Sequence, residues 1–300
     1  MEHALAQHST DTCTAKLQGT SVYPPYPRDP LTPCFSFTKA GNLTDELRRD
    51  DAIALLREAA SRVRRRGSVP FYPSFVLAGE SDSSTRLAKL IQGGRGGEVR
   101  LRLYLCITMM ATGRPYDLKR SPAPSRWASL LALPEEGGSR RVSSNLKWLA
   151  DHNYIKLERR SSHTPIITLL SADGSGGEYI SPRGQGRYLG VPVELWTQGW
   201  IINLSATALA LLFCLLELLG GHKKARYVTQ DRRARYGLSS DTWTRATTEL
   251  ALAGILAVGR TPQGGDFDYK RLRNTYWVDL DRLKGRSDNS SSTPLVNFEN

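Results

Sequence analysis

The amino-acid sequence predicts a mainly helical α+β protein in which one structural unit, ending in a small β-hairpin, occurs twice in tandem. Three observations lead to this prediction. The composition, with 40% apolar and 23% charged residues, is typical of a folded chain and excludes global disorder. Two segments contain the same succession of an apolar helix, a short helix, a turn and a third helix, and each third helix precedes two short strands. The 300 residues can form two such domains of roughly 100–200 residues each.

The two predicted units span residues 98–170 and 193–283. Each begins with an apolar helix and continues with a shorter helix and a polar or glycine-containing turn. The apolar helices are expected over Leu101–Met110 and Ala206–Leu219, and the shorter helices over Ser125–Leu133 and Thr229–Tyr236.

The third helices give the clearest sign of duplication. They are expected over Ser139–His152 and Ser240–Ala253, and a serine opens each of them as a cap. The two helices align without a gap at an offset of 101 residues, since 243 − 142 = 101 brings Trp243 opposite Val142. At the same offset Leu250 lies opposite Leu149.

Each third helix is followed by the same local signal for a strand. Asn153 in the first unit matches Gly254 in the second, and these are the residue types that best tolerate the left-handed conformation at a helix C-terminus. Two apolar residues follow in both units and turn the chain into a strand. The hairpin strands are expected over Tyr154–Arg159 with Ile166–Leu169, and over Leu256–Arg260 with Asn274–Asp279.

Three helices followed by a β-hairpin resemble the winged helix-turn-helix domain, and two of them in a chain of this length resemble the plasmid replication initiators. The resemblance covers roughly residues 98–283 and rests on the pattern and its repetition, without a diagnostic catalytic motif. It implies binding to double-stranded DNA, with each third helix in a major groove. Since the first unit of tandem initiators often serves for dimerisation, it also implies a homodimer formed through residues 98–170.

Helical spacing divides each third helix into a buried stripe and an outward face. Val142, Leu146 and Leu149, at i, i+4 and i+7, are expected to face the core. Arginine suits guanine O6 and N7, whereas serine and lysine suit phosphates or mixed contacts. The candidate DNA-binding residues on the two helices are Arg140, Arg141, Ser143, Ser144, Lys147, Thr242, Thr244, Arg245 and Thr248. Asp241 could cap its helix instead, since a carboxylate that faces phosphates is costly.

The two hairpins, or wings, add cations to this surface. Further basic residues lie beside the shorter helix of the second unit, at Arg226, Arg232, Arg233 and Arg235. A solvated surface is the alternative interpretation of each cation, but recurrence at equivalent positions favours a shared DNA-facing surface. The candidate wing residues are Arg159, Arg160, Arg260, Lys270, Arg271 and Arg273.

The remaining segments are expected to flank or connect the units. Residues 1–40 are rich in proline and show no periodicity, which predicts a disordered tail, and residues 284–300 are expected to form another. Residues 41–97 are expected to form a helical segment that ends in a hinge at Gly93–Gly97. Residues 171–192 contain six glycines between 171 and 190 and are expected to form a linker.

The net charge of +12 favours a polyanionic partner. The basic residues are 31 arginines and 10 lysines. Arginine has the fork geometry that suits phosphate and guanine, which favours nucleic acid. The alternative explanation of this bias is genome composition, because arginine codons are rich in G and C. The charge therefore indicates a polyanionic partner but says nothing about the fold.

Several functional classes lack support in the sequence. Four cysteines are too few for a disulfide scaffold, and Cys106 and Cys214 lie in apolar runs as small buried hydrophobes. The five histidines lack metal-ligand spacing, so neither a metal nor another cofactor is expected. The apolar run Leu204–Leu219 is shorter than the roughly 20 residues that cross a bilayer. Because no signal peptide is visible, we expect a soluble, cytoplasmic protein without a membrane partner.

Two kinds of function remain open at this stage. The first is sequence-specific binding of double-stranded DNA, in replication initiation or in transcriptional regulation. The alternative is a winged-helix scaffold or dimerisation module with weak, non-specific affinity for DNA. No enzyme is expected, because the sequence shows no nucleophile with its base and no acidic constellation with metal spacing.

Overall fold

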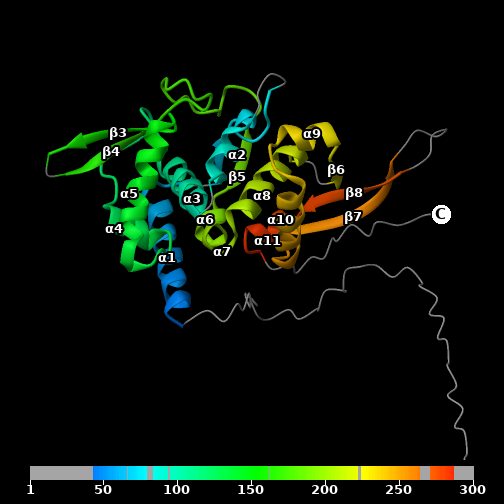
Figure 1. The fold of residues 1–300 in the computed structure, drawn as a ribbon, viewed down its shortest axis with the longest axis horizontal. Coiled ribbons are helices and arrows are strands. Elements are labelled where there is room, and N and C mark those ends of the chain that lie inside the picture. The colour runs from blue at the N-terminus through cyan, green and yellow to red at the C-terminus, as the bar shows by residue number, and fades with distance from the viewer. Residues whose placement is uncertain are drawn as a thin grey trace, which may run out of the picture. The chain divides into compact units, whose positions relative to one another are not determined.

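A succession of six elements, α-β-α-α-β-β, occurs twice in the computed structural model, which has an α+β fold (Figure 1). The structure describes residues 43–65, 67–79, 84–93, 95–161, 163–221, 224–263 and 271–286, which all belong to one compact unit. The first copy comprises α3 (Arg95–Met110), β2 (Asp117–Leu118), α4 (Pro124–Leu130), α5 (Glu135–Asp151), β3 (Ile155–Arg160) and β4 (His163–Leu169). The second copy comprises α8 (Ala206–Leu219), β6 (Arg226–Tyr227), α9 (Gln230–Arg235), α10 (Ser240–Leu252), β7 (Leu256–Gln263) and β8 (Arg271–Val278).

The sheets of the two copies have the same topology. Each is antiparallel with three strands, in the order β2-β4-β3 in the first copy and β6-β8-β7 in the second. The last strand is therefore central in both sheets. The short strands β2 and β6 were not predicted, because two residues are too few for a periodicity signal. The hairpins β3–β4 and β7–β8 project from opposite sides of the body (Figure 1).

The predicted ends of the third helices are confirmed. Asn153 and Gly254 both have left-handed backbone conformations, with φ values of 56° and 71°. The apolar pairs that follow, Tyr154–Ile155 and Ile255–Leu256, are buried. The offset of 101 residues therefore relates positions with the same structural role.

The starts of the third helices differ from the prediction in detail. In α10 the cap is Ser239, whose Oγ accepts a hydrogen bond from the backbone N–H of Thr242, and Ser240 is the first helical residue. In α5 the backbone leaves the helical conformation at Glu136 and Gly137, so the regular helix begins beyond them. That start agrees with the predicted one at Ser139.

Seven further elements precede or connect the two copies, and one follows them. The N-terminal segment contributes α1 (Leu43–Arg62), β1 (Ser68–Phe71), the 3-10 helix η1 (Pro73–Phe75) and α2 (Arg86–Ile91). The connection between the copies contains β5 (Leu189–Pro192), α6 (Glu194–Thr197) and α7 (Trp200–Asn203), and α11 (Leu280–Leu283) follows the second copy. The predicted tail over 1–40, and most of the one over 284–300, lie outside the described residues.

Two glycine-rich stretches are more structured than the sequence predicted. The prediction of a hinge at Gly93–Gly97 is wrong over residues 95–97, because α3 already begins at Arg95. Gly97 lies so close to the preceding helix that a Cβ atom there would come within 2.5 Å of the Ile91 carbonyl oxygen. The expected linker over 171–192 contains the buried Tyr179 and ends in β5, which pairs antiparallel with β1.

A series of buried aromatic rings joins the two copies. Phe213 of α8 contacts Phe71 and Phe75, with ring centroids 5.1 Å and 6.2 Å apart. Phe75 continues to Tyr104 of α3 at 5.4 Å, and Tyr104 to Tyr154 at 5.3 Å. The N-terminal segment 41–97, whose role the sequence left open, thus fills the space between the first helices of the copies.

Arg102 adds a polar contact between the copies. Its Nη2 donates to the carbonyl oxygens of Ile202 and Leu204, at 2.9 Å and 3.1 Å, just before α8 begins. The same guanidinium pairs with Glu98 at 2.7 Å. Burial lowers the pKa of Arg102, and the neighbouring Glu98 carboxylate partly opposes this shift. The Arg102 guanidinium of the first copy therefore binds the chain just before the first helix of the second copy.

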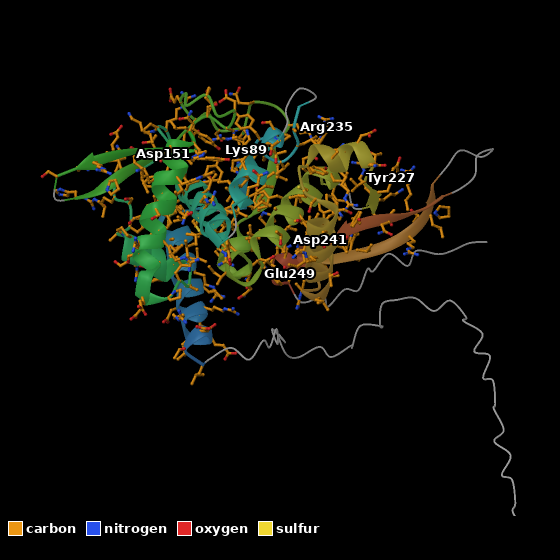
Figure 2. The ribbon with its side chains drawn as sticks, in the orientation of Figure 1. Lys89, Asp151, Tyr227, Arg235, Asp241 and Glu249 are labelled. Atoms are coloured by element: carbon orange, nitrogen blue, oxygen red, sulfur yellow. The ribbon has the colours of Figure 1, made fainter. Side chains whose placement is uncertain are left out.

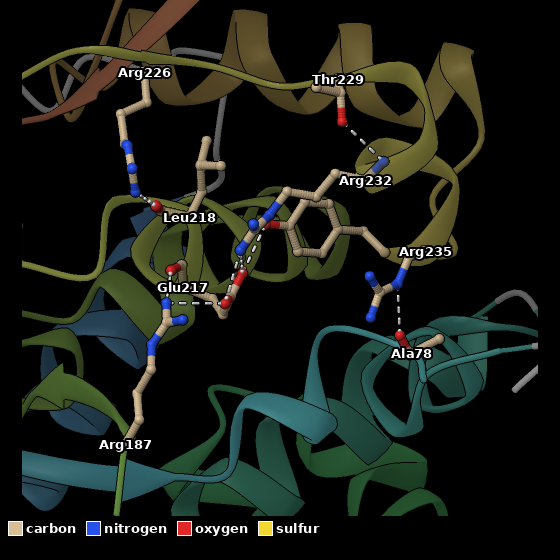
Figure 3. A network of polar contacts seen from close by, with 9 residues as sticks. Ala78, Arg187, Glu217, Leu218, Arg226, Thr229, Arg232 and Arg235 are labelled. Atoms are coloured by element: carbon tan, nitrogen blue, oxygen red, sulfur yellow. Dashed lines mark hydrogen bonds and ion pairs between the residues drawn. The ribbon is translucent and has the colours of Figure 1, made fainter. Parts of the chain in front are cut away.

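Glu217 organises the inside of the second copy (Figure 3). Glu217 lies on α8, and its side chain is only 2% exposed. Its carboxylate accepts hydrogen bonds from Arg232 and from the Tyr236 hydroxyl, both at 2.8 Å. Arg187, which precedes β5, pairs with it at 3.1 Å. The first and second helices of the copy are thus fastened to the stretch that connects the two copies.

The apolar helix predicted over Ala206–Leu219 is confirmed as α8, which is buried along almost all of its length. Within the part of the chain that the structure describes, none of the helices combines the length and apolarity needed to cross a membrane.

Replacing Glu217 tests the network in Figure 3. Glu217→Gln is expected to lower the free energy of unfolding by about 3 kcal/mol, because a neutral amide leaves Arg232 without its buried counter-charge. Urea unfolding followed by circular dichroism measures the change. Glu46→Gln, on the exposed first turn of α1, is the matched control and is expected to change the stability little. Equal stability of the two variants would contradict the role given to Glu217.

The buried tyrosines predict a loss of stability in alkali. Burial raises the pKa of Tyr104 and of Tyr154 from about 10 to about 12. Below pH 10 both states keep the phenol protons, but between pH 10 and 12 the unfolded chain releases them first, so the folded state loses stability as the pH rises. We expect a loss of about 1 kcal/mol per tyrosine between pH 10 and 11 in urea titrations, and a smaller loss in Tyr104→Phe.

Candidate nucleic-acid interface

The third helix of the first copy exposes the residues that its spacing predicted. Val142, Leu146 and Leu149 are buried against the core, which fixes the rotation of α5. The opposite face is exposed and carries Arg140, Arg141, Ser143, Ser144 and Lys147. No described side chain forms an ion pair with its three cations, which therefore remain available to an anionic ligand.

The third helix of the second copy has a different polar face. Trp243, Ala246 and Leu250 are buried, and the predicted residues Thr244, Arg245 and Thr248 are exposed. Thr242 differs from its prediction as an outward residue, because it is half-buried and its Oγ1 accepts a hydrogen bond from Ser239 at 2.8 Å. It belongs to the cap of α10 rather than to its outer face.

Asp241 pairs with Arg245 and does not cap the helix. The distance between Asp241 Oδ2 and Arg245 Nη2 is 2.8 Å, and both side chains are about three-quarters exposed. Asp241 lies near the N-terminus of α10 and Glu249 near its C-terminus (Figure 2). Because exposed pairs one helical turn apart are weak, Arg245 can leave Asp241 for another acceptor.

The two third helices thus differ at equivalent positions. At the offset of 101 residues, Asp241 takes the place of Arg140, and Arg245 takes the place of Ser144. The outer face of α5 carries unpaired cations, while that of α10 carries threonines and an arginine held by a carboxylate. The face of α5 therefore has the stronger electrostatic attraction for phosphates, and the face of α10 has the more constrained polar groups.

Hydroxyl groups on both faces are oriented by their own helices. Ser143 donates to the Ser139 carbonyl at 3.0 Å, and Thr244 and Thr248 donate to the carbonyls four residues earlier, at 3.0 Å and 3.2 Å. Because each hydroxyl donates its proton to a backbone carbonyl, its oxygen can only accept a hydrogen bond from a ligand. Such acceptors suit the amino groups of bases better than they suit phosphate oxygens.

Glu249 fixes the position of α10, a role that the sequence did not reveal. Its carboxylate accepts hydrogen bonds from the backbone N–H and the hydroxyl of Ser205, at 2.7 Å and 2.6 Å, at the N-terminus of α8. The two residues are 44 positions apart, so no local pattern could have indicated the contact.

The wings expose four of their six predicted cations. Arg159, Arg160 and Arg260 are exposed, and Arg273 is exposed with its guanidinium 5.6 Å from the ring centroid of Tyr227. Lys270 and the side chain of Arg271 lie outside the described residues. The described wing cations lie on the hairpins β3–β4 and β7–β8, which project from opposite sides of the body (Figure 1).

The basic residues beside the shorter helix of the second copy are structural instead. Arg232 binds the buried Glu217, and Arg235 donates to the Ala78 carbonyl at 2.9 Å. Arg226 donates to the Leu218 carbonyl at the end of α8, also at 2.9 Å. Arg233 donates to Ser240 and lies over the ring of Trp243. At these four positions the predicted DNA-facing cations are engaged by groups of the protein itself.

Arginines fasten helix ends elsewhere in the fold as well. Arg65 donates to three carbonyls at the end of α3, and Arg86 donates to His152 and Asn153 at the end of α5. Ten arginines in the described segments donate to backbone carbonyls: Arg48, Arg57, Arg65, Arg86, Arg102, Arg183, Arg187, Arg226, Arg233 and Arg235. Part of the arginine excess therefore has a structural cause.

Other groups that could form a site have structural roles. Cys106 and Cys214 are buried free thiols, as predicted, and burial raises the pKa of both. Trp148 contacts the Arg100 guanidinium and stacks on His152, so its ring is engaged within the protein. Within the segments that the structure describes, no cluster of three or more histidine, cysteine or acidic residues could hold a metal ion.

Comparison with protein-family models finds no match for this chain, and comparisons with curated proteins and with solved structures find none either.

Proposed function

We propose that the two copies are winged helix-turn-helix domains and that the chain binds double-stranded DNA through them. The succession α-β-α-α-β-β with the last strand central supports the first part of the proposal. The observation that carries the second part is the face of α5, where three exposed cations without partners, Arg140, Arg141 and Lys147, flank the exposed Ser143 and Ser144.

In this proposal the third helices read bases and the wings bind the backbone. Arg141 and Arg245 are the candidates for guanine, with hydroxyl acceptors beside them. Arg159 and Arg260 lie on hairpins that extend from the body, where they can reach phosphates beside the groove. A chain with two reading helices can contact two segments of major groove without an additional subunit.

Replication initiation and transcriptional regulation are the processes that fit such a protein. The described residues form the two copies and the segments that join them, without a separate ligand-sensing domain. This architecture resembles the tandem plasmid initiators more than a regulator with an effector domain, and an initiator of that kind is our first choice.

A protein-interaction scaffold is the second candidate function. It is favoured by two apolar side chains on the second copy, Leu252 at the end of α10 and Leu272 on β8, which are 70% and 65% exposed. Exposed leucines suit a protein partner, since DNA offers few apolar surfaces apart from thymine methyl groups.

Selection of bound duplexes from a random pool tests the proposed function. A recovered motif made of direct repeats would support an initiator, and a palindrome would support a dimeric regulator. If no motif emerges and the protein does not bind duplex DNA at about 50 mM salt, the scaffold replaces DNA binding as the better account.

Helix and wing arginines are expected to behave differently when they are removed. Arg141→Ala and Arg245→Ala should each cost about 1–3 kcal/mol on the selected site and relax the base preference at one position. Arg159→Ala and Arg260→Ala should weaken binding to all duplexes alike and lower the salt slope by about one unit. Fluorescence anisotropy on the selected duplex and on a scrambled one measures both effects, and identical behaviour of the two pairs would contradict these roles.

Removing the partner of Arg245 should affect selectivity more than stability. Asp241→Asn is expected to change the free energy of unfolding by less than about 0.5 kcal/mol, because the pair is exposed. It should strengthen binding to scrambled duplex, since a repelling carboxylate is lost and Arg245 is released. Competition binding measures the ratio of selected to scrambled affinity, which should fall. An unchanged ratio would show that Asp241 does not restrain Arg245.

A further inference from the structure

A small polar pocket lies where the end of α1, the end of α3 and the stretch before β5 meet. Its volume is about 80 Å³, and Arg65, Tyr116, Tyr179 and Arg183 are among the residues that line it. At roughly 30 Å³ for each water, this space can hold one small ion but no nucleotide base. None of the described lining residues belongs to α5 or α10, so the pocket is separate from the faces discussed above.

Two guanidinium groups bring positive charge to this pocket. Arg65 uses Nε and Nη2 to bind the end of α3, which leaves its Nη1 without a described acceptor. Arg183 uses Nη2 to bind Ser68, which leaves Nε and Nη1. None of the described lining residues carries a carboxylate. Burial and the charge of Arg183 lower the pKa of Arg65, a cost that an anion between the two groups would relieve.

Tyr179 adds a third polar side chain to the lining of the pocket. Tyr179 is only 5% exposed, and its ring packs edge-on against Tyr116 with centroids 5.0 Å apart. The residue lines the pocket, and its hydroxyl forms no hydrogen bond with another described residue. Burial raises the pKa of Tyr179, so the hydroxyl keeps its proton at neutral pH and can donate it to a ligand. The hydroxyl is not among the buried polar atoms that lack a partner, so it is accessible and can donate to an anion in the pocket.

We propose that this pocket binds one phosphate-type oxyanion, held by the free N–H groups of Arg65 and Arg183 and by the Tyr179 hydroxyl. Guanidinium forks and a neutral hydroxyl are donors that match the several acceptor oxygens of such an anion. The bound anion would connect α1, α3 and the stretch before β5, and so stabilise the contact between the N-terminal segment and the chain between the copies. The proposal does not depend on DNA binding.

Titration with inorganic phosphate tests the proposal. Isothermal calorimetry at constant ionic strength, with chloride replaced by phosphate, is expected to show saturable binding of one phosphate per chain. Tyr179→Phe removes only the hydroxyl and should weaken binding at least fivefold, whereas Tyr188→Phe, a tyrosine outside this pocket, should bind as the wild type does. Arg183→Gln, at an exposed position, should abolish binding and serves as the second variant if Tyr179→Phe does not fold.

The source of the phosphate is decided by a second titration with duplex DNA. If the ligand is a free anion, inorganic phosphate binds and Arg183→Gln leaves duplex affinity unchanged. If the ligand is a backbone phosphate, Arg183→Gln and Tyr179→Phe weaken duplex binding and Arg183→Gln lowers the salt slope by about one unit. Both outcomes support the site. The proposal is overturned if neither ligand distinguishes these variants from the wild type, whereas phosphate binding without duplex binding would refute only the proposed function.

Discussion

Phe71 and Phe75 pack between α3 and α8 and hold the two copies of the repeated unit together. These rings come from the N-terminal segment and contact both copies of the repeated unit, through Phe213 on one side and Tyr104 on the other. Aromatic side chains bury about 150–250 Å² each, so the four rings bury a sizeable apolar surface between the copies. Exposing the core of one copy would also expose that of the other, and we expect the two to unfold as one body.

The packing of helix ends changes the interpretation of the basic charge. Where a helix end packs against another element of the fold, its last carbonyl groups need donors. Arg65, Arg86 and Arg102 supply these donors, because a planar guanidinium reaches several carbonyls at once. The net charge of +12 therefore overstates the charge available to a polyanion, and the unpaired cations on α5 and the wings are the relevant part.

Much of the fold was predictable because its signals are local. The left-handed residues Asn153 and Gly254, with apolar pairs after them, located both third helices and their hairpins. The short strands β2 and β6 were missed because they are defined by pairing with a distant strand. Among the site residues, spacing predicted the outward face of α5, but it could not reveal that Asp241 holds Arg245 or that Glu249 binds Ser205. These contacts depend on rotamers and on packing between elements.

The proposed function requires that the shared core present α5 and α10 to DNA together. It is tested most directly by the affinity of the chain for a selected duplex into which five base pairs, about half a helical turn, are inserted between the two half-sites. Because the shared core fixes the two helices relative to each other, the account predicts that this insertion lowers the affinity at least about a hundredfold, nearly to that of a single half-site. Equal affinity for the original and the lengthened duplex would contradict it.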